Sequence, residues 1–558
     1  MRKTPTIYGL FSLVLFLSSV TTWGQKKILI KHANEGKYIS GKIAPEEKNT
    51  LIGNVRFEHD GALMDCDSAW LFSANNTLKA FGNVKINQGD TLFVYGDKLD
   101  YNGNTKLAVM RKNVRLIDDD VQLFTEVLNF DRQSNKAYYT VGGKIIDDET
   151  TLVSHEGVYY SKTKWYHFRG DVVVTNPEYV IESDTLHYHT ERKVALFKGP
   201  STIIGDSSDI YCENGFYNTV TNIAQFEKNA IVRDKNTFIT GDSIYYEQTR
   251  GFGQAFENVV IYDTIEHYTI RGEFGEYLRE PEYAFVTGYP TYAMLIEDDS
   301  LYIYGDTLYS RKVDSLDRKV VNIWPRVKFF KTDLQGKCDS LVYQDLDSSI
   351  YMFRDPVVWD DSTQITGKHI IITLKDGTLD SLKVYEDAFI IAIEDYDFFH
   401  QVKGRDMFGK FVNDNLKRVL VVGNGQTLYV IREDEDTENP PYVGVSRGEC
   451  SEILIVFDDD GDIDQMTYIK QAETKTYPME DVTKELTRLE GFYPRFNERP
   501  ATKEDIYPKD RIRKNPPVKE APSEEDSENS HLESQEIHLE DTTESKTESS
   551  SESNTEKE

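Results

Sequence analysis

The nine residues FVYGDKLDY, from Phe93 to Tyr101, place apolar or aromatic side chains at alternate positions around a glycine and an acid. Similar stretches follow as VIESDTLHY from Val180, FITGDSIYY from Phe238 and LYIYGDTLY from Leu301. Alternation with a period of two is typical of a β-strand whose apolar residues share one face. The stretch therefore predicts a strand that the chain repeats.

The repeat has a period of about 29 residues. The acids of successive copies are Asp67, Asp97, Glu126, Glu156, Asp184, Glu213, Asp242, Glu273, Asp306 and Asp339, at steps of 30, 29, 30, 28, 29, 29, 31, 33 and 33. Four residues after nearly every acid stands an aromatic residue. Turn signals such as NGNT at Asn102 and QSNK at Gln133 recur about every half repeat, so each repeat contains two antiparallel strands.

Small residues fall midway between these turns. Gly96 lies near the middle of its strand, and the neighbouring strands carry FGN or FEKN at the same level. A glycine in a strand interior is typical of a bulge or bend. Bends at every midpoint predict an all-β fold, a long creased antiparallel jelly roll or solenoid built from two-strand repeats. We expect the acid beside each bend to accept backbone N–H groups, with a row of cation ligands as the alternative.

The two ends of the chain differ from the repeats. Arg2 and Lys3 precede an apolar run from Ile7 to Val20, which predicts a signal peptide of residues 1–24 because the run is too short to cross a bilayer. Residues 520–558 contain 14 acidic residues and two lysines, a net charge of −12, and are expected to be disordered. The remaining chain still carries −19, which argues against nucleic acid as a partner.

The repeats divide the mature chain. We expect regular repeats over residues 25–370, then a degenerate continuation or a second β domain over residues 371–480. Residues 481–558 are expected to form a short helix, within PMEDVTKELTRL from Pro478, and the acidic tail.

Chemical sites are weak in this sequence. Cys66, Cys212 and Cys338 each precede a repeat acid and are too many strands apart for disulfides, so we expect small buried residues there. His187 and His189 share a strand face, but no spacing completes a metal site. No nucleophile elbow, phosphate loop or catalytic triad is recognisable. We therefore predict a protein that is not an enzyme and has no metal or cofactor.

The signal peptide, the G-N-V strands and the (G/S)-D-x-(L/I)-x-Y strands together resemble the OstA-like family of lipopolysaccharide-transport bridge proteins, from about Ile52 to Tyr343. The resemblance implies creased jelly rolls that shield the acyl chains of lipopolysaccharide for transport to the outer membrane and assembly there. It also implies a location in the periplasm, associated with the outer membrane. The implied partners are lipopolysaccharide and other OstA-like jelly rolls of the inner- and outer-membrane transport complexes, joined by edge-strand pairing.

By analogy with this family, an inner face of aromatic and aliphatic residues would bind lipid. The candidates are Leu99, Tyr101, Leu128, Phe130, Tyr160, Leu186, Tyr188, Tyr217, Ile244 and Tyr246. The same residues could simply pack on one another as a core. A structural or adhesive envelope solenoid without lipid cargo is then the alternative function, and a polysaccharide-processing enzyme on a repeat scaffold is a weaker third.

Overall fold

The computed structural model describes residues 26–39, 47–89, 91–205, 208–234, 236–265, 267–296, 299–313, 318–360, 362–375, 378–395, 397–412, 415–433, 440–458 and 463–509. The predicted signal peptide and the predicted acidic tail lie outside these residues. The chain forms two compact units, one of residues 1–235 and 242–249 and the other of residues 236–241 and 250–558. In the described part, forty strands and four short 3-10 helices confirm the predicted all-β fold. No helix in this part is both long and apolar enough to cross a membrane.

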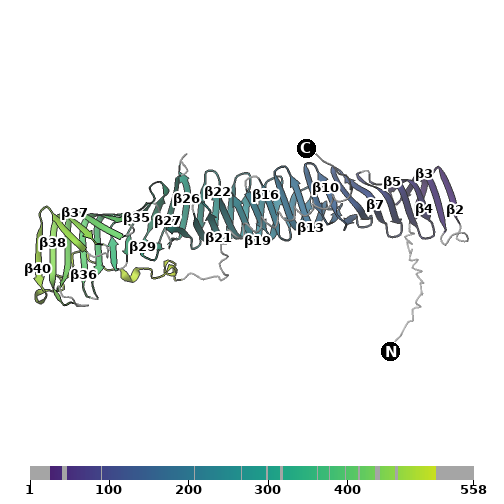
Figure 1. Cartoon of the computed structure of the whole chain (residues 1–558). Helices are drawn as coiled ribbons and strands as arrows, with labels where there is room; N and C mark the ends of the chain where they lie inside the picture. Colours follow the sequence, from purple (N-terminus) through teal and green to yellow (C-terminus); the bar gives the residue numbers. More distant parts are fainter. Residues whose placement is uncertain are drawn as a thin grey trace, which may run out of the picture. The chain divides into compact units, whose positions relative to one another are not determined.

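The first unit is an antiparallel sheet, purple to blue in Figure 1, in which consecutive long strands pair in chain order and the strands broken at the crease pair half by half. Its strands are β1 (Leu29–His32), β2 (Glu35–Ile39), β3 (Lys48–His59), β4 (Ala62–Phe72), β5 (Thr77–Gln88), β6 (Leu92–Asn102), β7 (Leu107–Asp118), β8 (Val121–Asp131), β9 (Lys136–Tyr139), β10 (Gly143–Asp147), β11 (Thr150–Ser154), β12 (Glu156–Tyr160), β13 (Trp165–Asn176), β14 (Tyr179–His189), β15 (Val194–Phe197), β16 (Ser201–Gly205), β17 (Ser208–Cys212), β18 (Asn214–Asn218) and β19 (Ile223–Asp234). Strand β20 (Thr237–Glu247) contributes its second half.

A bulge creases the sheet at the middle of the hairpins formed by long strands, as predicted. Phe81 pairs with Lys98 and Val84 with Gly96, so Gly82 and Asn83 stand opposite the single residue Asp97. Gly82 and Asn83 both have positive φ, 71° and 45°. The role predicted for Gly96 is wrong in detail, because the left-handed residues lie on the partner strand. Gly96 is needed instead for close packing, since a Cβ there would come within 2.5 Å of Met110.

Two kinds of turn form the two long edges of the creased sheet. Two-residue turns at 60–61, 119–120, 148–149 and 177–178 form one edge, which we call the short-turn rim. Four-residue turns at 73–76, 103–106, 132–135, 161–164, 190–193 and 219–222 form the long-turn rim. Each four-residue turn ends on a residue in the left-handed region, with φ between 52° and 60°. These residues are Asn76, Lys106, Asn135, Lys164, Lys193 and Asn222.

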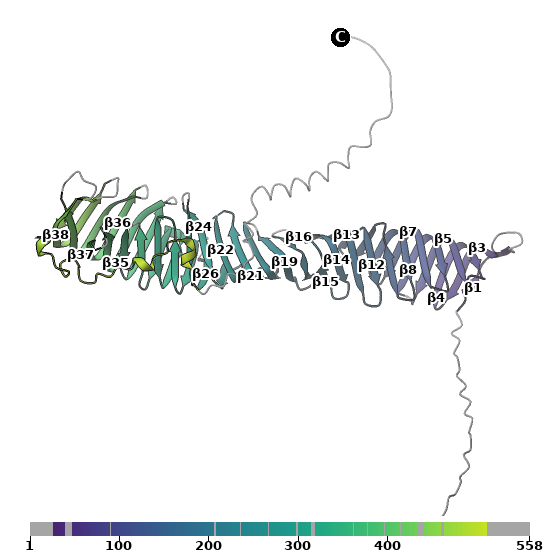
Figure 2. The same cartoon turned by 90° about the horizontal axis from the view of Figure 1, so that it is seen from below.

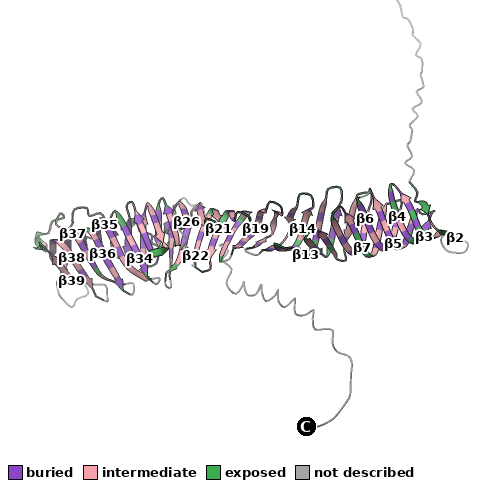
Figure 3. Cartoon of the chain, turned by 90° about the horizontal axis from the view of Figure 1, so that it is seen from above, coloured by how far each residue is buried: buried purple, intermediate pink, exposed green. Residues whose placement is uncertain are grey.

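The inner faces of the two half-sheets form the core of this unit. Burial alternates along each strand, so that Leu92, Val94, Leu99 and Tyr101 of β6 are buried while their neighbours are more exposed (Figure 3). Each fully buried apolar side chain contributes about 1.5–3 kcal/mol to folding. The period-two pattern of the sequence thus becomes a continuous interior between the half-sheets.

The second unit continues the antiparallel pattern with longer strands towards its C-terminal end, green in Figure 1. Its strands are β21 (Phe252–Asp263), β22 (Tyr268–Leu278), β23 (Tyr283–Thr287), β24 (Thr291–Ile296), β25 (Asp299–Tyr304), β26 (Thr307–Val313), β27 (Arg318–Trp324), β28 (Val327–Phe330), β29 (Leu334–Cys338), β30 (Ser340–Gln344), β31 (Ser349–Phe353), β32 (Val357–Asp360), β33 (Thr363–Thr366), β34 (His369–Lys375), β35 (Thr378–Ile393), β36 (Phe399–Val412), β37 (Asn415–Arg432), β38 (Tyr442–Phe457), β39 (Ile463–Ile469) and β40 (Glu473–Pro478). A 3-10 helix, η1 (Asp345–Asp347), lies between β30 and β31.

The ladder of this unit runs without a break through residue 370. Strand β34 pairs with both β31 and β35, and Ile370 itself lies opposite Met352 and Val384. The border between the two compact units also lies well before this position. A domain division at residue 370 therefore stays a prediction. The strand pairing in the described residues is continuous at this position.

After β40 the chain turns back as a strap over the second unit, yellow-green in Figures 1 and 2. It contains η2 (Met479–Asp481), η3 (Phe496–Glu498) and η4 (Lys503–Ile506). The predicted short helix after Pro478 is reduced to the three residues of η2, and turns follow it along the sheet. Gln401 of β36 donates from Nε2 to the carbonyl of Thr487 and accepts the N–H of Leu489, both at 2.8 Å. The side chain of Gln401 thus bonds two residues of the strap that are two apart, as the backbone of a neighbouring parallel strand would.

A second glutamine repeats this arrangement further along the strap. Gln364 of β33 donates to the carbonyl of Tyr493 and accepts the N–H of Arg495, at 3.0 and 2.6 Å. Both glutamines are 1% exposed. Leu489 of the strap packs among Phe389, Ile391 and Leu428. These contacts outweigh the helical propensity of the segment, since propensity differences are under about 1 kcal/mol per residue.

Candidate functional site

Most of the predicted lipid-binding residues lie together in the interior of the first unit. Eight of the ten are buried, and their exposure runs from 0% for Leu128 to 5% for Tyr246. The buried members are Leu99, Tyr101, Leu128, Phe130, Leu186, Tyr217, Ile244 and Tyr246. They come from strands of successive repeats, so the interior is apolar in each of them. In the structure these side chains pack against one another. That they bind lipid stays a prediction.

Tyr160 lies on the outer face, so its placement in the inner row is wrong. Its neighbour Tyr159 is 3% exposed and stacks on Tyr166, with ring centroids 4.1 Å apart. Tyr160 instead packs beside His167 on the outside of the sheet. The repeat position predicted for Glu156 is occupied by His155, whose N–H donates to Gly170 at the crease. The uneven steps of 30 and 28 around Glu156 were the signal, since His155 makes both steps 29.

Tyr188 lies at a cavity between the two half-sheets. The cavity has a volume of about 30 Å³ and is bounded by Phe168, Leu186 and other apolar residues from both halves. Tyr188 is half-buried, and its hydroxyl hydrogen-bonds Thr219 of the long-turn rim. A volume of this size holds about one or two water molecules and no hydrocarbon chain.

One polar atom at this cavity has no partner. The hydroxyl of Tyr166 is buried and makes no hydrogen bond within the described part of the chain, although Tyr166 lines the cavity. Burial raises the pKa of Tyr166 well above its usual value. A buried hydroxyl without a partner costs about 1–3 kcal/mol. Tyr139, by contrast, shares a hydrogen bond of 2.7 Å with Ser154.

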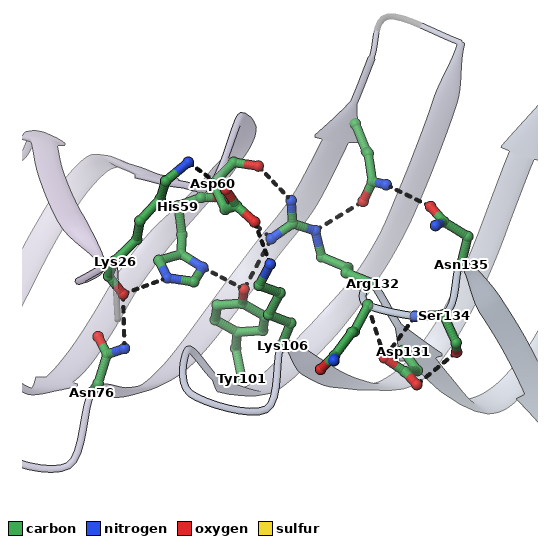
Figure 4. Close-up of polar contacts among 12 residues, drawn as sticks. Lys26, His59, Asp60, Asn76, Tyr101, Lys106, Asp131, Arg132, Ser134 and Asn135 are labelled. Carbon is green, nitrogen blue, oxygen red and sulfur yellow. Dashed lines mark hydrogen bonds and ion pairs between the residues drawn. The ribbon is translucent and has the colours of Figure 1, made fainter. Parts of the chain in front are cut away.

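Polar side chains join the two rims where these face each other, opposite the crease, as Figure 4 shows around Tyr101. His59 donates from Nε2 to the carbonyl of Lys26 at 2.8 Å, so its Nδ1 accepts the Tyr101 hydroxyl at 2.7 Å. Arg132 donates to the same hydroxyl at 2.9 Å and to the carbonyl of Asp60 at 3.2 Å. Burial raises the pKa of Tyr101. The cluster thus closes the rim with a fully bonded network.

Ion pairs repeat this closure further along the rims. Lys106 pairs with Asp60, and hydrogen bonds from Lys106 and then Lys26 hold the pKa of that aspartate well below its usual range. Lys164 lies 3.0 Å from Asp118 and 3.1 Å from Asp119, and Lys193 lies 2.7 Å from Asp147. In each of the pairs Lys106–Asp60, Lys164–Asp118 and Lys193–Asp147, the lysine follows its aspartate by 46 residues. We call these three pairs the rim latch.

Comparison with known families bears on this architecture. A family described as OstA-like protein matches residues 25–184 and 185–287. Over these residues the chain belongs to the OstA-like family. The matched range takes in the described strands from β1 to β23, and with them the apolar interior and the rim latch of the first unit. No curated protein matches the chain.

The acids of the OstA-like repeats hold the crease through side chains, which corrects the expected backbone contacts. Asp67 accepts the side-chain amide of Asn83 at 2.9 Å, and Asp97 accepts that of Asn113 at 2.8 Å. The backbone N–H and C=O groups at the bend are paired with other backbone groups. For example, the N–H of Asp184 donates to the carbonyl of Pro200. The acids therefore position the residues of the bulge.

Neither histidine nor cysteine builds a second site in the part of the chain that the structure describes. His187 stacks on His167 with ring centroids 3.7 Å apart, whereas His189 packs on Trp165. The described residues contain no group of three His, Cys, Asp or Glu placed to hold a metal ion. All four cysteines are free and buried. Burial raises the pKa of Cys66, Cys212 and Cys338 to about 12.

The rim latch is the part of the OstA-like site that the sequence analysis missed. A signal was present, because Lys106, Lys164 and Lys193 end their turns at intervals that are multiples of 29 residues. Their partners could not be found this way, since the separation of 46 residues depends on how the rims meet across the interior. Spacing within one strand or hairpin carries no such information.

Proposed function

We propose that the chain is a periplasmic bridge-type protein that binds and shields the acyl chains of lipopolysaccharide during transport to the outer membrane and assembly there. The observation that carries this proposal is the apolar interior of the first unit, to which strands of successive OstA-like repeats contribute. Burial of each methylene is worth about 0.8 kcal/mol, so such an interior stabilises an acyl chain without specific contacts. The role requires no chemistry on the cargo.

The ends of the strand order support assembly with similar proteins. In the described residues, β1 and β2 pair only with β3, and β39 and β40 pair only with β38. Such edges offer backbone donors and acceptors to a strand of another chain. The proposal therefore includes other OstA-like jelly rolls of the inner- and outer-membrane transport complexes as partners, joined by edge-strand pairing.

Photocrosslinking in living cells tests the cargo. A photoreactive residue at Tyr188 lies at the cavity, whereas the same residue at Tyr160 lies on the outer face and serves as the control. The proposal predicts lipopolysaccharide adducts from position 188 and few from position 160. Equal adducts at both positions, or none at either, would contradict it.

A structural or adhesive envelope solenoid without cargo is the second candidate. Tight packing of the inner face favours it, because Leu99 and Leu186 are each 1% exposed and the cavity beside Tyr188 is small. Depletion of the protein separates the two functions. A transport protein predicts a leaky outer membrane with less lipopolysaccharide at the surface, whereas a scaffold predicts a normal amount.

A further inference from the structure

The cavity beside Tyr188 lies under the last pair of the rim latch. Asp147 and Thr150 beside the short-turn rim, and Thr190 and Thr219 on the long-turn rim, border the cavity. Lys193 reaches over from the long-turn rim to pair with Asp147 at 2.7 Å. The side chain of Asp147 is 10% exposed and that of Lys193 is 36% exposed. One face of the pair thus meets solvent and the other meets the apolar interior.

The three latch lysines have a backbone conformation that is energetically unfavourable for lysine. Lys106, Lys164 and Lys193 have φ of 60°, 55° and 52°, in the left-handed region that favours glycine and asparagine. The same turn position is occupied by asparagine in three other repeats, at Asn76, Asn135 and Asn222. Lysine therefore gives up backbone stability there, which points to a role for its side chain.

We propose that the Lys193–Asp147 pair is the opening point of the rim latch, where an anionic amphiphile enters the interior of the first unit. The anionic head group takes the place of Asp147 on the Lys193 ammonium, and the hydrocarbon chain enters the cavity as the rims separate. This inference rests on the proposed function, because it says where a lipid enters the interior that the proposed function assigns to acyl chains. The exchange replaces the ion pair of Lys193 with another and releases the Asp147 carboxylate, which water solvates once the rims have separated.

The structure of the cavity supports this choice of pair. At about 30 Å³ the closed cavity is too small for a hydrocarbon chain, so binding requires the rims to move apart. Around Tyr101, the rims are held by the additional bonds of His59 and Arg132. Tyr159 adds a hydrogen bond to Asp118 beside Lys164. At Lys193 the described polar contact across the rims is a single ion pair, and the next contact along the rims is the edge-to-face ring pair of Tyr179 and Tyr217.

Thiol labelling tests the latch without any lipid. Tyr188→Cys places a thiol at the cavity, while the four native cysteines are buried. In this background Lys193→Asn, which copies the native turns at Asn135 and Asn222, should raise the maleimide labelling rate about fivefold, the equivalent of roughly 1 kcal/mol for one ion pair. Lys144→Asn removes an exposed lysine of β10 and should leave the rate unchanged. An unchanged rate in Lys193→Asn would overturn the latch.

Binding of 11-(dansylamino)undecanoic acid and of its methyl ester tests the ligand. For Lys193→Asn the inference predicts faster association of both probes, and about fivefold faster dissociation of the acid alone, because only the acid uses the lysine. Equal dissociation of the acid from native protein and variant would overturn the head-group role. If native protein and variant bind neither probe, the proposed function fails as well, whereas the labelling result still reports on the latch.

Discussion

The buried hydroxyl of Tyr166, at the cavity, has no hydrogen-bond partner in the described structure. Tyr166→Phe should therefore keep or raise the free energy of unfolding, by up to about 1 kcal/mol. Tyr139→Phe is the matched control, because it breaks the bond to Ser154 and should lower that free energy by about 1 kcal/mol. Urea denaturation measures both, and a loss of stability in Tyr166→Phe would contradict the assignment of an unpaired hydroxyl.

The register of the fourth repeat gives a second prediction at this scale. Tyr159→Ala should lower the free energy of unfolding by about 3–5 kcal/mol, because it removes a buried ring that stacks on Tyr166. Tyr160→Ala removes an outer-face ring and should cost about 1 kcal/mol or less. Thermal or urea unfolding distinguishes the two. Equal losses would mean that the inward residue of this strand is misassigned.

Single residues also show what the sequence could predict. Leu99, Tyr101, Leu128 and Phe130 are buried as a period-two strand requires, so pattern alone was sufficient for them. Tyr160 is not predictable in this way, because the acid of its repeat, Glu156, lies one residue after the structural position, which His155 occupies. A shift of one residue turns every side chain of a strand to the other face.

At the scale of the strand, the crease depends on bulge residues that tolerate positive φ. Gly82→Ala forces an alanine to φ 71° and brings its Cβ within 2.3 Å of Asp67 Oδ2. Gly89→Ala has nearly the same φ, 70°, and no atom within 4 Å of its Cβ. We expect a loss of about 1–2 kcal/mol for Gly89→Ala, from the backbone alone. Gly82→Ala should lose about 1 kcal/mol more in urea denaturation, because the bond from Asn83 to Asp67 breaks; equal losses would contradict this role of Asp67.

The strap adds a pH-dependent element to the second unit. Hydrogen bonds from Arg495, and then from Lys337, lower the pKa of Glu498 to about 2 from an unfolded value near 4.5. The stabilisation by this carboxylate is therefore complete above about pH 4.5 and is lost as the pH falls towards 2. Glu498→Gln should reduce the free energy of unfolding at pH 6 and weaken its pH dependence between pH 4.5 and 2.

Urea denaturation of the second unit at several pH values measures this effect. Glu490→Gln changes an exposed carboxylate of the same strap and should leave the profile unchanged. The same pH dependence in Glu498→Gln and in the native protein would contradict a role for Glu498 in holding the strap. The strap itself could not be predicted, because buried glutamines such as Gln364 and Gln401 override a helical pattern only once the sheet has formed.

At the scale of the whole molecule, the period of about 29 residues was enough to predict an all-β creased repeat fold. It could not predict the division into two compact units, which depends on contacts between distant repeats and not on the motif. It also could not predict the rim latch, since Lys193 and Asp147 meet only when the rims face each other across the interior. Local alternation determines strands, whereas the contacts that close the interior are long-range.

A scan of photoreactive residues along the interior in living cells tests the central claim most directly. Inward positions 99, 128, 186 and 244 belong to four different repeats, and positions 98, 185 and 243 point the other way on the same strands. Transport of lipid through the interior predicts lipopolysaccharide adducts at the four inward positions and at none of the outward ones. Inward positions that crosslink only to the chain itself, while the glycolipid still reaches the cell surface, would show that the interior is a packed core and not a path for lipid.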